Sequence, residues 1–113
     1  MRADGKLDYL EMPGGDLPGL KAFYAAAFGW RFTDYGPQYA AFSEGLDGGF
    51  DADRQAAPAA PLPVLFSTDL EACLATVQAA GAVITRPIFA FPGGRRFHFR
   101  DPAGNELAVW AES

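Results

Sequence analysis

Two glutamates stand out among the residues whose side chains could act in a reaction. Glu11 and Glu106 lie in strand-like segments near opposite ends of the chain. A carboxylate held in an apolar cleft has its pKa raised toward neutrality, so the two acids are candidates for general acid and general base. Pairs of this kind also arise by chance in a chain with 14 acidic residues, so purely structural roles stay open.

His98 is the only histidine of the chain. It lies between Phe97 and Phe99, and the alternation of a strand makes it face the side opposite to both. One interpretation is a strand residue that is partly exposed or packed against a helix. The other is a ligand or a general base. Cys73, the only cysteine, falls on the apolar side of a predicted helix and is interpreted as a small core residue.

A mixed aromatic and acidic wall follows if Tyr9 faces a cleft. Glu11 then shares its side of the first strand, and alternation places Glu106 and Trp110 on one face of the last strand. Such a surface suits a planar or cationic small molecule, held by stacking, cation–π attraction and carboxylates. Tyr9 and Trp110 equally suit a core or a dimer interface. The ligand-binding residues that we expect are Tyr9, Glu11, Phe42, Phe50, Arg95, Glu106 and Trp110.

Arg95 is included because it follows the turn-forming run Phe91-Pro92-Gly93-Gly94. A flexible turn at this point could bring its guanidinium group over the cleft, where it would grip a carboxylate or a phosphate. The alternative is that Arg95 keeps the edge of a hairpin solvated.

Composition restricts the classes of protein that these residues can serve. Half of the 113 residues are apolar and 14% are aromatic, which fits one globular domain. The net charge of −5 argues against nucleic acid as a partner. No run approaches the roughly 20 apolar residues of a membrane span, and no signal-peptide core follows Met1, so we expect a cytoplasmic protein. A single cysteine excludes an intrachain disulfide and a cysteine cluster for zinc or iron–sulfur.

The first half of the chain predicts a strand, a helix and three further strands. Residues 7–12 alternate like a strand, and Asp16 can cap a helix over about 17–28 that ends at Gly29. Apolar residues recur along this helix at three- and four-residue intervals, the spacing of one buried face. The three strands that follow are expected at 30–35, 39–43 and 48–51.

The second half repeats this order of elements. A strand at 64–67 is followed by Thr68-Asp69-Leu70-Glu71, which has the pattern of a capping box at the start of a helix. Gly81 closes that helix. Three further strands are expected at 82–88, 95–100 and 106–110.

Both halves therefore have the order βαβββ, and we expect one domain over residues 1–113. A first module covers about 1–52, an Ala/Pro-rich linker about 53–62, and a second module about 63–113. Each helix covers one face of its sheet, so the two sheets must pair to bury the other face, which leaves a cleft. The fold class is α+β with a mixed, mostly antiparallel sheet, because three consecutive strands with short turns cannot all be parallel.

Five short motifs in this order resemble the vicinal-oxygen-chelate superfamily, which comprises glyoxalases, bleomycin-resistance proteins and extradiol dioxygenases. They are Asp16 before the first helix, Lys21-Ala22-Phe23-Tyr24 within it, Phe28-Gly29-Trp30 at its end, Gly48-Gly49-Phe50, and Phe99-Arg100-Asp101-Pro102-Ala103-Gly104-Asn105. The resemblance covers nearly the whole chain. It implies paired βαβββ modules that form an open barrel around a metal or ligand site, with the helices outside. Lyases, isomerases, dioxygenases, thiol transferases and drug-sequestering proteins share this fold, so activity must be argued from the site.

The resemblance also implies four metal-ligand positions, two in each module. In this chain they hold Tyr9, Pro63, Ala108 and a residue near Ala41 or Phe42. Alanine and proline side chains supply no donor to zinc, iron or manganese, and one histidine cannot supply the two that these enzymes commonly use. A shift of two residues along a strand keeps the face and would place Glu11 and Glu106 inward, so a metal site on these acids stays open.

These observations favour a protein that binds a small organic molecule in a cleft without the usual metal. Its general design would be similar to that of the antibiotic-sequestering members, with no metal and no other cofactor. The alternative is a lyase, isomerase or dioxygenase that uses Glu11, Glu106 or His98 as non-standard ligands or as acid and base. The apolar sheet faces of so short a chain also predict a homodimer, as the resemblance to members of this length implies.

Overall fold

A computed structural model describes residues 2–52 and 60–113 of the chain. Its two helices and eight strands, parallel and antiparallel, confirm the predicted α+β class. They divide into two units, one formed by Tyr9–Pro61 and the other by Met1–Asp8 together with Leu62–Ser113. Most of the predicted linker at 53–62 lies outside the described residues. Among the described residues, no helix is long and apolar enough to cross a membrane.

The unit Tyr9–Pro61 contains four strands in the order β2-β3-β4-β1. Strand β1 pairs in parallel with β4, whereas β3 pairs antiparallel with both β4 and β2. The connection from β1 to the sheet edge runs through helix α1, as a parallel pairing requires. The elements are β1 (Leu7–Pro13), α1 (Leu17–Phe28), β2 (Thr33–Asp34), β3 (Tyr39–Ser43) and β4 (Asp47–Asp51).

Helix α1 begins and ends where the sequence predicts. The side chain of Asp16 accepts a hydrogen bond from the backbone N–H of Gly19 at 3.1 Å, which satisfies one of the free donors of the first turn. Gly29 follows the last helical residue with a φ of 73°, a left-handed conformation that glycine adopts without steric cost.

The core of this unit lies between α1 and its sheet. Leu17 of the helix packs with Ala40, Phe42 and Phe50, which are all buried. The rings of Tyr24, Trp30 and Phe32 surround them. Burial of each large apolar side chain contributes roughly 1.5–3 kcal/mol, so this cluster fixes which face of the sheet lies under the helix.

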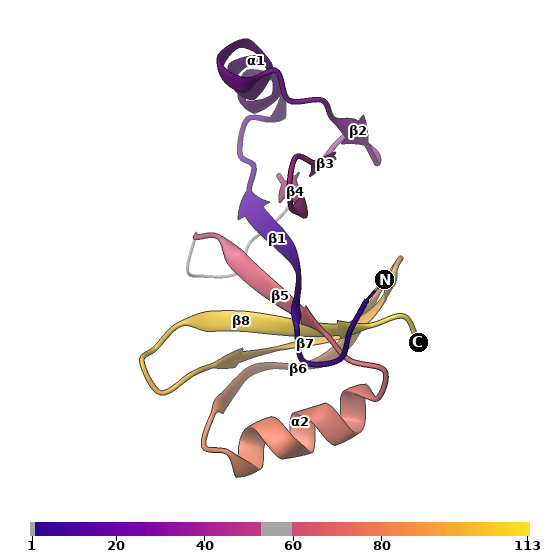
Figure 1. The fold of residues 1–113 in the computed structure, drawn as a ribbon, viewed down its shortest axis with the longest axis vertical. Coiled ribbons are helices and arrows are strands. Elements are labelled where there is room, and N and C mark those ends of the chain that lie inside the picture. Colours follow the sequence, from indigo (N-terminus) through magenta and orange to yellow (C-terminus); the bar gives the residue numbers. More distant parts are fainter. Residues whose placement is uncertain (1, 53–59) are drawn as a thin grey trace. The chain divides into compact units, whose positions relative to one another are not determined.

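The other unit contains four strands in the order β5-β8-β7-β6, and helix α2 lies along one face of them (Figure 1). Strands β5 and β8 are parallel, and β8, β7 and β6 follow one another antiparallel. The elements are β5 (Leu62–Phe66), α2 (Leu70–Ala79), β6 (Val83–Phe91), β7 (Gly94–Arg100) and β8 (Glu106–Ala111).

The start of α2 differs in detail from the predicted capping box. Asp69 is the N-cap, and its carboxylate accepts a hydrogen bond from the N–H of Ala72 at 3.1 Å. Glu71 therefore does not reach back to the cap. It lies in the first turn, where a negative charge is favourable, and pairs with Arg95 of β7.

Residues before β1 pack on this second unit. Asp4 forms a bridge to Phe66, and its carboxylate accepts hydrogen bonds from both the N–H and the hydroxyl of Thr68. The segment that opens the chain thus holds the end of β5 and the approach to α2.

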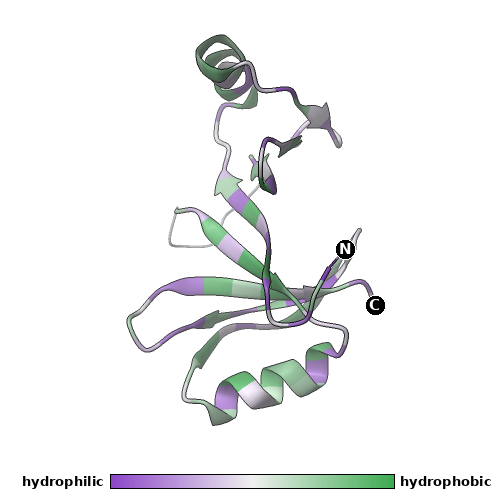
Figure 2. Ribbon diagram, viewed as in Figure 1, coloured by the Kyte–Doolittle hydropathy of each residue, from purple (hydrophilic) through white to green (hydrophobic). Residues whose placement is uncertain are grey.

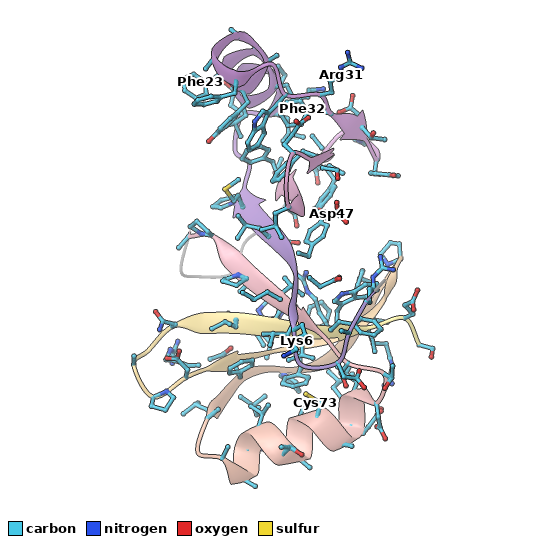
Figure 3. The ribbon with its side chains drawn as sticks, viewed as in Figure 1. Lys6, Phe23, Arg31, Phe32, Asp47 and Cys73 are labelled. Atoms are coloured by element: carbon cyan, nitrogen blue, oxygen red, sulfur yellow. The ribbon has the colours of Figure 1, made fainter. Side chains whose placement is uncertain are left out.

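The core under α2 identifies the two faces of this sheet. Leu70 of the helix packs with Phe97, Val109 and Ala111. Cys73 packs against the same cluster from α2, as predicted (Figure 3). Strand alternation sends the intervening residues of β7 and β8 to the opposite face.

Candidate functional site

The face of the β5-β8-β7-β6 sheet opposite α2, called here the far face, carries several polar groups that could do chemistry. Strand register places them in two rows. In one row Phe66, Trp110, Arg96 and Phe89 are neighbours. In the next row Val64, Ala108, His98 and Arg86 are neighbours.

At the centre of the second row, His98 forms a buried pair with Glu106. Nδ1 of His98 lies 3.1 Å from a carboxylate oxygen of Glu106, and the two side chains are only 2% and 6% exposed. Burial lowers the pKa of His98 below its usual value, although the hydrogen bond to Glu106 opposes this shift. The ring is therefore neutral near pH 7, with the hydrogen on Nδ1 donated to Glu106.

This arrangement leaves Nε2 of His98 as the atom that could meet a ligand. The atom is buried and has no hydrogen-bond partner within the part of the chain that the structure describes. A neutral imidazole with hydrogen on Nδ1 presents a lone pair at Nε2. Of the two interpretations of His98, the partly exposed or helix-packed residue is wrong, because the ring is buried on the face opposite α2.

Two arginines and two phenylalanines adjoin this histidine. The guanidinium carbon of Arg86 lies 4.0 Å from the ring centre of Phe89, and that of Arg96 lies 5.4 Å from the same ring. Arg96 also lies 5.6 Å from the ring centre of Phe91. The Phe89 and His98 rings are 5.7 Å apart. Cationic and aromatic side chains of β6 and β7 thus contact one another on this face.

Trp110 completes the far face on the side of β8. Its ring is half-buried and packs against Phe66 and Phe91, with centroid distances of 5.4 and 6.2 Å. The indole N–H donates to Asp8 at 3.0 Å. The Arg2 guanidinium lies 4.9 Å from the ring centre. These contacts fix the orientation of the indole plane.

A second polar group lies in the unit Tyr9–Pro61, on the face of its sheet opposite α1. Tyr9 and Glu11 share this face of β1, as predicted, and Glu11 is buried. The hydroxyl groups of Tyr9 and Tyr39 are hydrogen-bonded to each other. Burial raises the pKa of both phenols, so both stay protonated at neutral pH.

Three other predicted ligand residues lie elsewhere. Phe42 and Phe50 belong to the core under α1, on the face opposite to Tyr9 and Glu11. Arg95 lies on the α2 side of β7, where its guanidinium pairs with Glu71 at 3.1 Å. Of the predicted ligand residues, Tyr9 and Glu11 therefore share one sheet face in the unit Tyr9–Pro61. Glu106 and Trp110 share one sheet face in the other unit.

Several residues of these two groups escaped the sequence analysis. Arg86, Phe89 and Phe91 lie on β6, whose pairing with β7 shifts register twice, between Ile84 and Arg86 and between Arg86 and Phe89. Simple alternation fails across such irregularities, and the predicted strand ended at residue 88. Tyr39 is placed by Gly49, because the absence of a side chain there leaves room for the tyrosine ring. The signal in the sequence that could have indicated the position of Tyr39 is the glycine at position 49, which leaves room for an aromatic ring from a neighbouring strand.

Comparison with known proteins identifies the family. Residues 6–109 match the family model of the Glyoxalase/Bleomycin resistance protein/Dioxygenase superfamily. The chain belongs to this superfamily. A search of curated protein sequences found no match.

Solved structures of other proteins share the fold at low sequence identity. A methylmalonyl-CoA epimerase from Mycobacterium tuberculosis is 13% identical with a TM-score of 0.67, covering 100% of this chain and 91% of that one. A Mn(II)-bound glyoxalase from Novosphingobium aromaticivorans is 24% identical with a TM-score of 0.60, covering 92% of this chain and 37% of that one. A NAD-dependent benzaldehyde dehydrogenase from Legionella pneumophila is 14% identical with a TM-score of 0.76, covering 93% of this chain and 98% of that one. Identities this low establish similarity of fold alone.

The superfamily's metal site can be tested against the residues of this chain. Pro63 was assigned to the ligand position of β5, but it shares its side of the strand with Leu65, which packs under α2. Val64 faces the same way as Ala108, its register partner. The side chains of valine, alanine and proline all lack a donor atom for a metal ion. In the described parts of the chain, no three His, Cys, Asp or Glu residues are grouped to hold a metal ion. The residues therefore do not fit the superfamily's metal.

Proposed function

We propose that this superfamily member binds a small planar organic molecule on the far face, without the usual metal. The observation that carries the proposal is the buried Nε2 atom of His98, which has no hydrogen-bond partner within residues 2–52 and 60–113. A buried polar atom without a partner costs roughly 1–3 kcal/mol. A ligand that donates a hydrogen bond to Nε2 would recover this energy.

The surroundings of His98 suit a flat ring system. Phe89, Phe91 and Trp110 present aromatic surface on the same side of the sheet. Stacking and burial of a ligand ring against such side chains supply affinity, while one or two polar groups fix its orientation. The pairing of Nδ1 with Glu106 holds the imidazole in one orientation, so Nε2 is already positioned before a ligand arrives.

Calorimetric titration with 2-naphthoate and 2-naphthamide, before and after dialysis against a chelator, tests this proposal. We expect binding of at least one probe and no change in its dissociation constant after dialysis. Trp110→Ala should weaken binding by about 30-fold, the equivalent of roughly 2 kcal/mol for an aromatic anchor. Phe23→Ala is the matched control, since Phe23 is an exposed ring on α1. Binding that disappears with the metal, or that both variants weaken equally, would refute the proposal.

The second candidate is an isomerase that moves a proton, and the His98–Glu106 pair favours it. A carboxylate that accepts from Nδ1 makes Nε2 a competent base. Nε2 would remove a proton from a carbon next to a carbonyl group, leaving an enolate, and the resulting imidazolium would return a proton to that carbon. Lyase and dioxygenase reactions have no such observation in their favour.

Exchange of the benzylic hydrogens of phenylacetone in D2O, followed by proton NMR, tests this candidate. A catalyst of this kind should accelerate exchange in proportion to protein concentration, and His98→Gln should abolish the acceleration. Glu106→Gln should lower it while leaving His98 in place. Equal exchange with wild type and His98→Gln would exclude proton transfer through Nε2.

A further inference from the structure

We infer that the ligand of the far face carries a neutral hydrogen-bond donor, an O–H or a ring N–H, at the edge of a flat aromatic ring. The inference rests on the proposed function and names the chemical class of the molecule that is bound. It differs from the cationic ligand that the acidic residues of the sequence suggested. The buried Nε2 atom of His98, next to the ring of Phe89, carries it.

The partner of one ring nitrogen of His98 decides what the other nitrogen can bind. Nδ1 lies 3.1 Å from a carboxylate oxygen of Glu106, and both side chains are buried. A carboxylate accepts hydrogen bonds and does not donate them, so the ring hydrogen belongs on Nδ1. Nε2 of the neutral ring is then an acceptor. A ligand group that meets Nε2 must therefore donate, which excludes an ether, an ester and a carboxylate at this point.

The burial of Nε2 limits both the size and the charge of that donor. The atom is buried, and His98 as a whole is 1% exposed. An O–H group places a single heavy atom beyond its ring, and a ring N–H places none, so both are small enough to approach a buried atom. An ammonium group would bring a full charge out of water, which costs far more than the burial of a neutral donor. A neutral donor is therefore favoured.

The edge of the sheet offers the way to this atom. Strand β6 is the last strand in the order β5-β8-β7-β6. Its register shifts between Arg86, the strand partner of His98, and Phe89. Pro87 lies in this stretch, is exposed and has no backbone N–H to donate to a neighbouring strand. Segments held by few backbone hydrogen bonds open locally at low cost, so a small group can reach Nε2 past this part of β6.

The ring of Phe89 explains why the donor belongs on an aromatic molecule. Its centre lies 5.7 Å from that of the His98 imidazole, with the two planes tilted by 50°. The Phe89 side chain is only half-buried, so part of its surface is available for contact. A flat ring that packs on Phe89 lies close enough for a group on its edge to meet the imidazole.

Two pairs of flat probes, each differing by one methyl group on the donor, test the inference. They are 6-hydroxyquinoline with 6-methoxyquinoline, and indole with 1-methylindole, each titrated into the full chain by calorimetry. We expect at least one unmethylated probe to bind about tenfold more tightly than its methylated partner, because only the former satisfies Nε2. A difference in the first pair alone identifies a hydroxyl ligand, and a difference in the second pair alone identifies a ring N–H; either supports the inference.

The double variant His98→Phe with Glu106→Gln removes the acceptor without leaving a buried carboxylate unpaired. It should abolish the difference within each pair and leave the affinity for the methylated probes unchanged. Gln78→Ala is the control, since it removes an exposed polar side chain from α2, on the other side of the sheet. This variant should keep the wild-type difference. Circular dichroism verifies that both proteins are folded.

Nitrogen NMR of the labelled wild type tests the inference without any substitution. His98 is the only histidine, so its two ring nitrogens are assigned without ambiguity. We expect one nitrogen that bears hydrogen and one with a free lone pair, Nε2, whose signal moves upfield with the donor probes and not with their methylated partners. Hydrogen on Nε2, or equal affinity within both pairs, would overturn the inference and leave small-molecule binding intact. Binding of no probe would overturn the proposed function as well.

Discussion

The neutral imidazole of His98 makes the stability of the protein depend on pH. Burial lowers its pKa in the folded state, whereas the unfolded chain has the ordinary value of about 6.5. The folded state therefore binds this proton less readily than the unfolded state does. The stability that follows from this difference is present above about pH 6.5 and is lost as the pH falls below it.

We predict that the free energy of unfolding falls more steeply for the wild type than for His98→Gln between about pH 7 and pH 5.5. This range brackets the ordinary histidine pKa of about 6.5. Urea denaturation at three pH values in this range measures it. Carboxylates that do not contact His98 affect both proteins equally, so their contribution cancels in the comparison. If the free energy of unfolding depends on pH in the same way for both proteins, protonation of His98 does not destabilise the folded state.

Gly49 allows the ring of Tyr39 to lie against the backbone of β4. A Cβ atom at this position would collide with the Tyr39 ring and hydroxyl. Gly49→Ala should displace Tyr39, break its hydrogen bond to Tyr9 and destabilise the protein by about 1–3 kcal/mol, the usual cost of overpacking. Chemical denaturation measures the change. Gly15→Ala is the control, because a Cβ there meets no atom within 4 Å; equal loss in both variants would contradict the collision.

At the scale of the elements, the caps decide where the helices begin. Asp16 and Asp69 each accept a hydrogen bond of 3.1 Å from an N–H of the first turn. Asp69→Ala should lower the free energy of unfolding by about 1 kcal/mol. Glu71→Ala should lower it less, because its ion pair with Arg95 is exposed and screened by solvent. Thermal and urea denaturation rank the two variants, and a larger loss in Glu71→Ala would favour the capping box after all.

These same local signals explain which elements were predictable from the sequence. Helix α1 was predicted to the residue, because Asp16 and Gly29 act through the backbone of neighbouring residues alone. Strand β6 was predicted too short, since its register shifts depend on pairing with β7. Strand β2 was predicted too long and spans only Thr33–Asp34.

The candidate site was predictable only where one strand supplied both residues. Alternation correctly placed Tyr9 with Glu11, and Glu106 with Trp110. The side of β7 that His98 occupies depends on where α2 packs, which no local pattern reveals. Arg86 joins the site through pairing between strands. Such long-range pairing is set by the whole sheet and leaves little trace in a short window of sequence.

For the molecule as a whole, the surface of α1 supports the proposed homodimer. Apolar residues predominate in this helix (Figure 2). Phe23 and Phe28 are 58% and 66% exposed, and their rings lie 6.5 Å apart on the helix. Neighbouring exposed rings of this kind mark surfaces where proteins associate.

We predict that sedimentation equilibrium at tens of micromolar protein gives a mass near twice the 12.1 kDa of one chain. Replacement of both rings, Phe23→Ser with Phe28→Ser, should shift the mass toward that of the monomer. Leu46→Ser, which changes another exposed apolar residue, serves as the control. A wild-type mass of one chain would end the dimer proposal, and a dimer unaffected by the double substitution would move the interface away from α1.

The attachment of residues 2–8 to the second unit has a bearing on how the chain acquires its structure during synthesis. Asp4 reaches Thr68 across 64 positions, and Trp110 reaches Asp8 across 102. The ribosome releases residues 2–8 before the unit Tyr9–Pro61, yet their partners in β5 and β8 emerge only after that unit has been made. Residues 2–8 therefore cannot dock until β5 and β8 are present. The entropy lost on closing the long loop between them slows this docking. Substitutions within residues 2–8 should therefore affect the stability of β5 and β8, which lie far from them in the sequence.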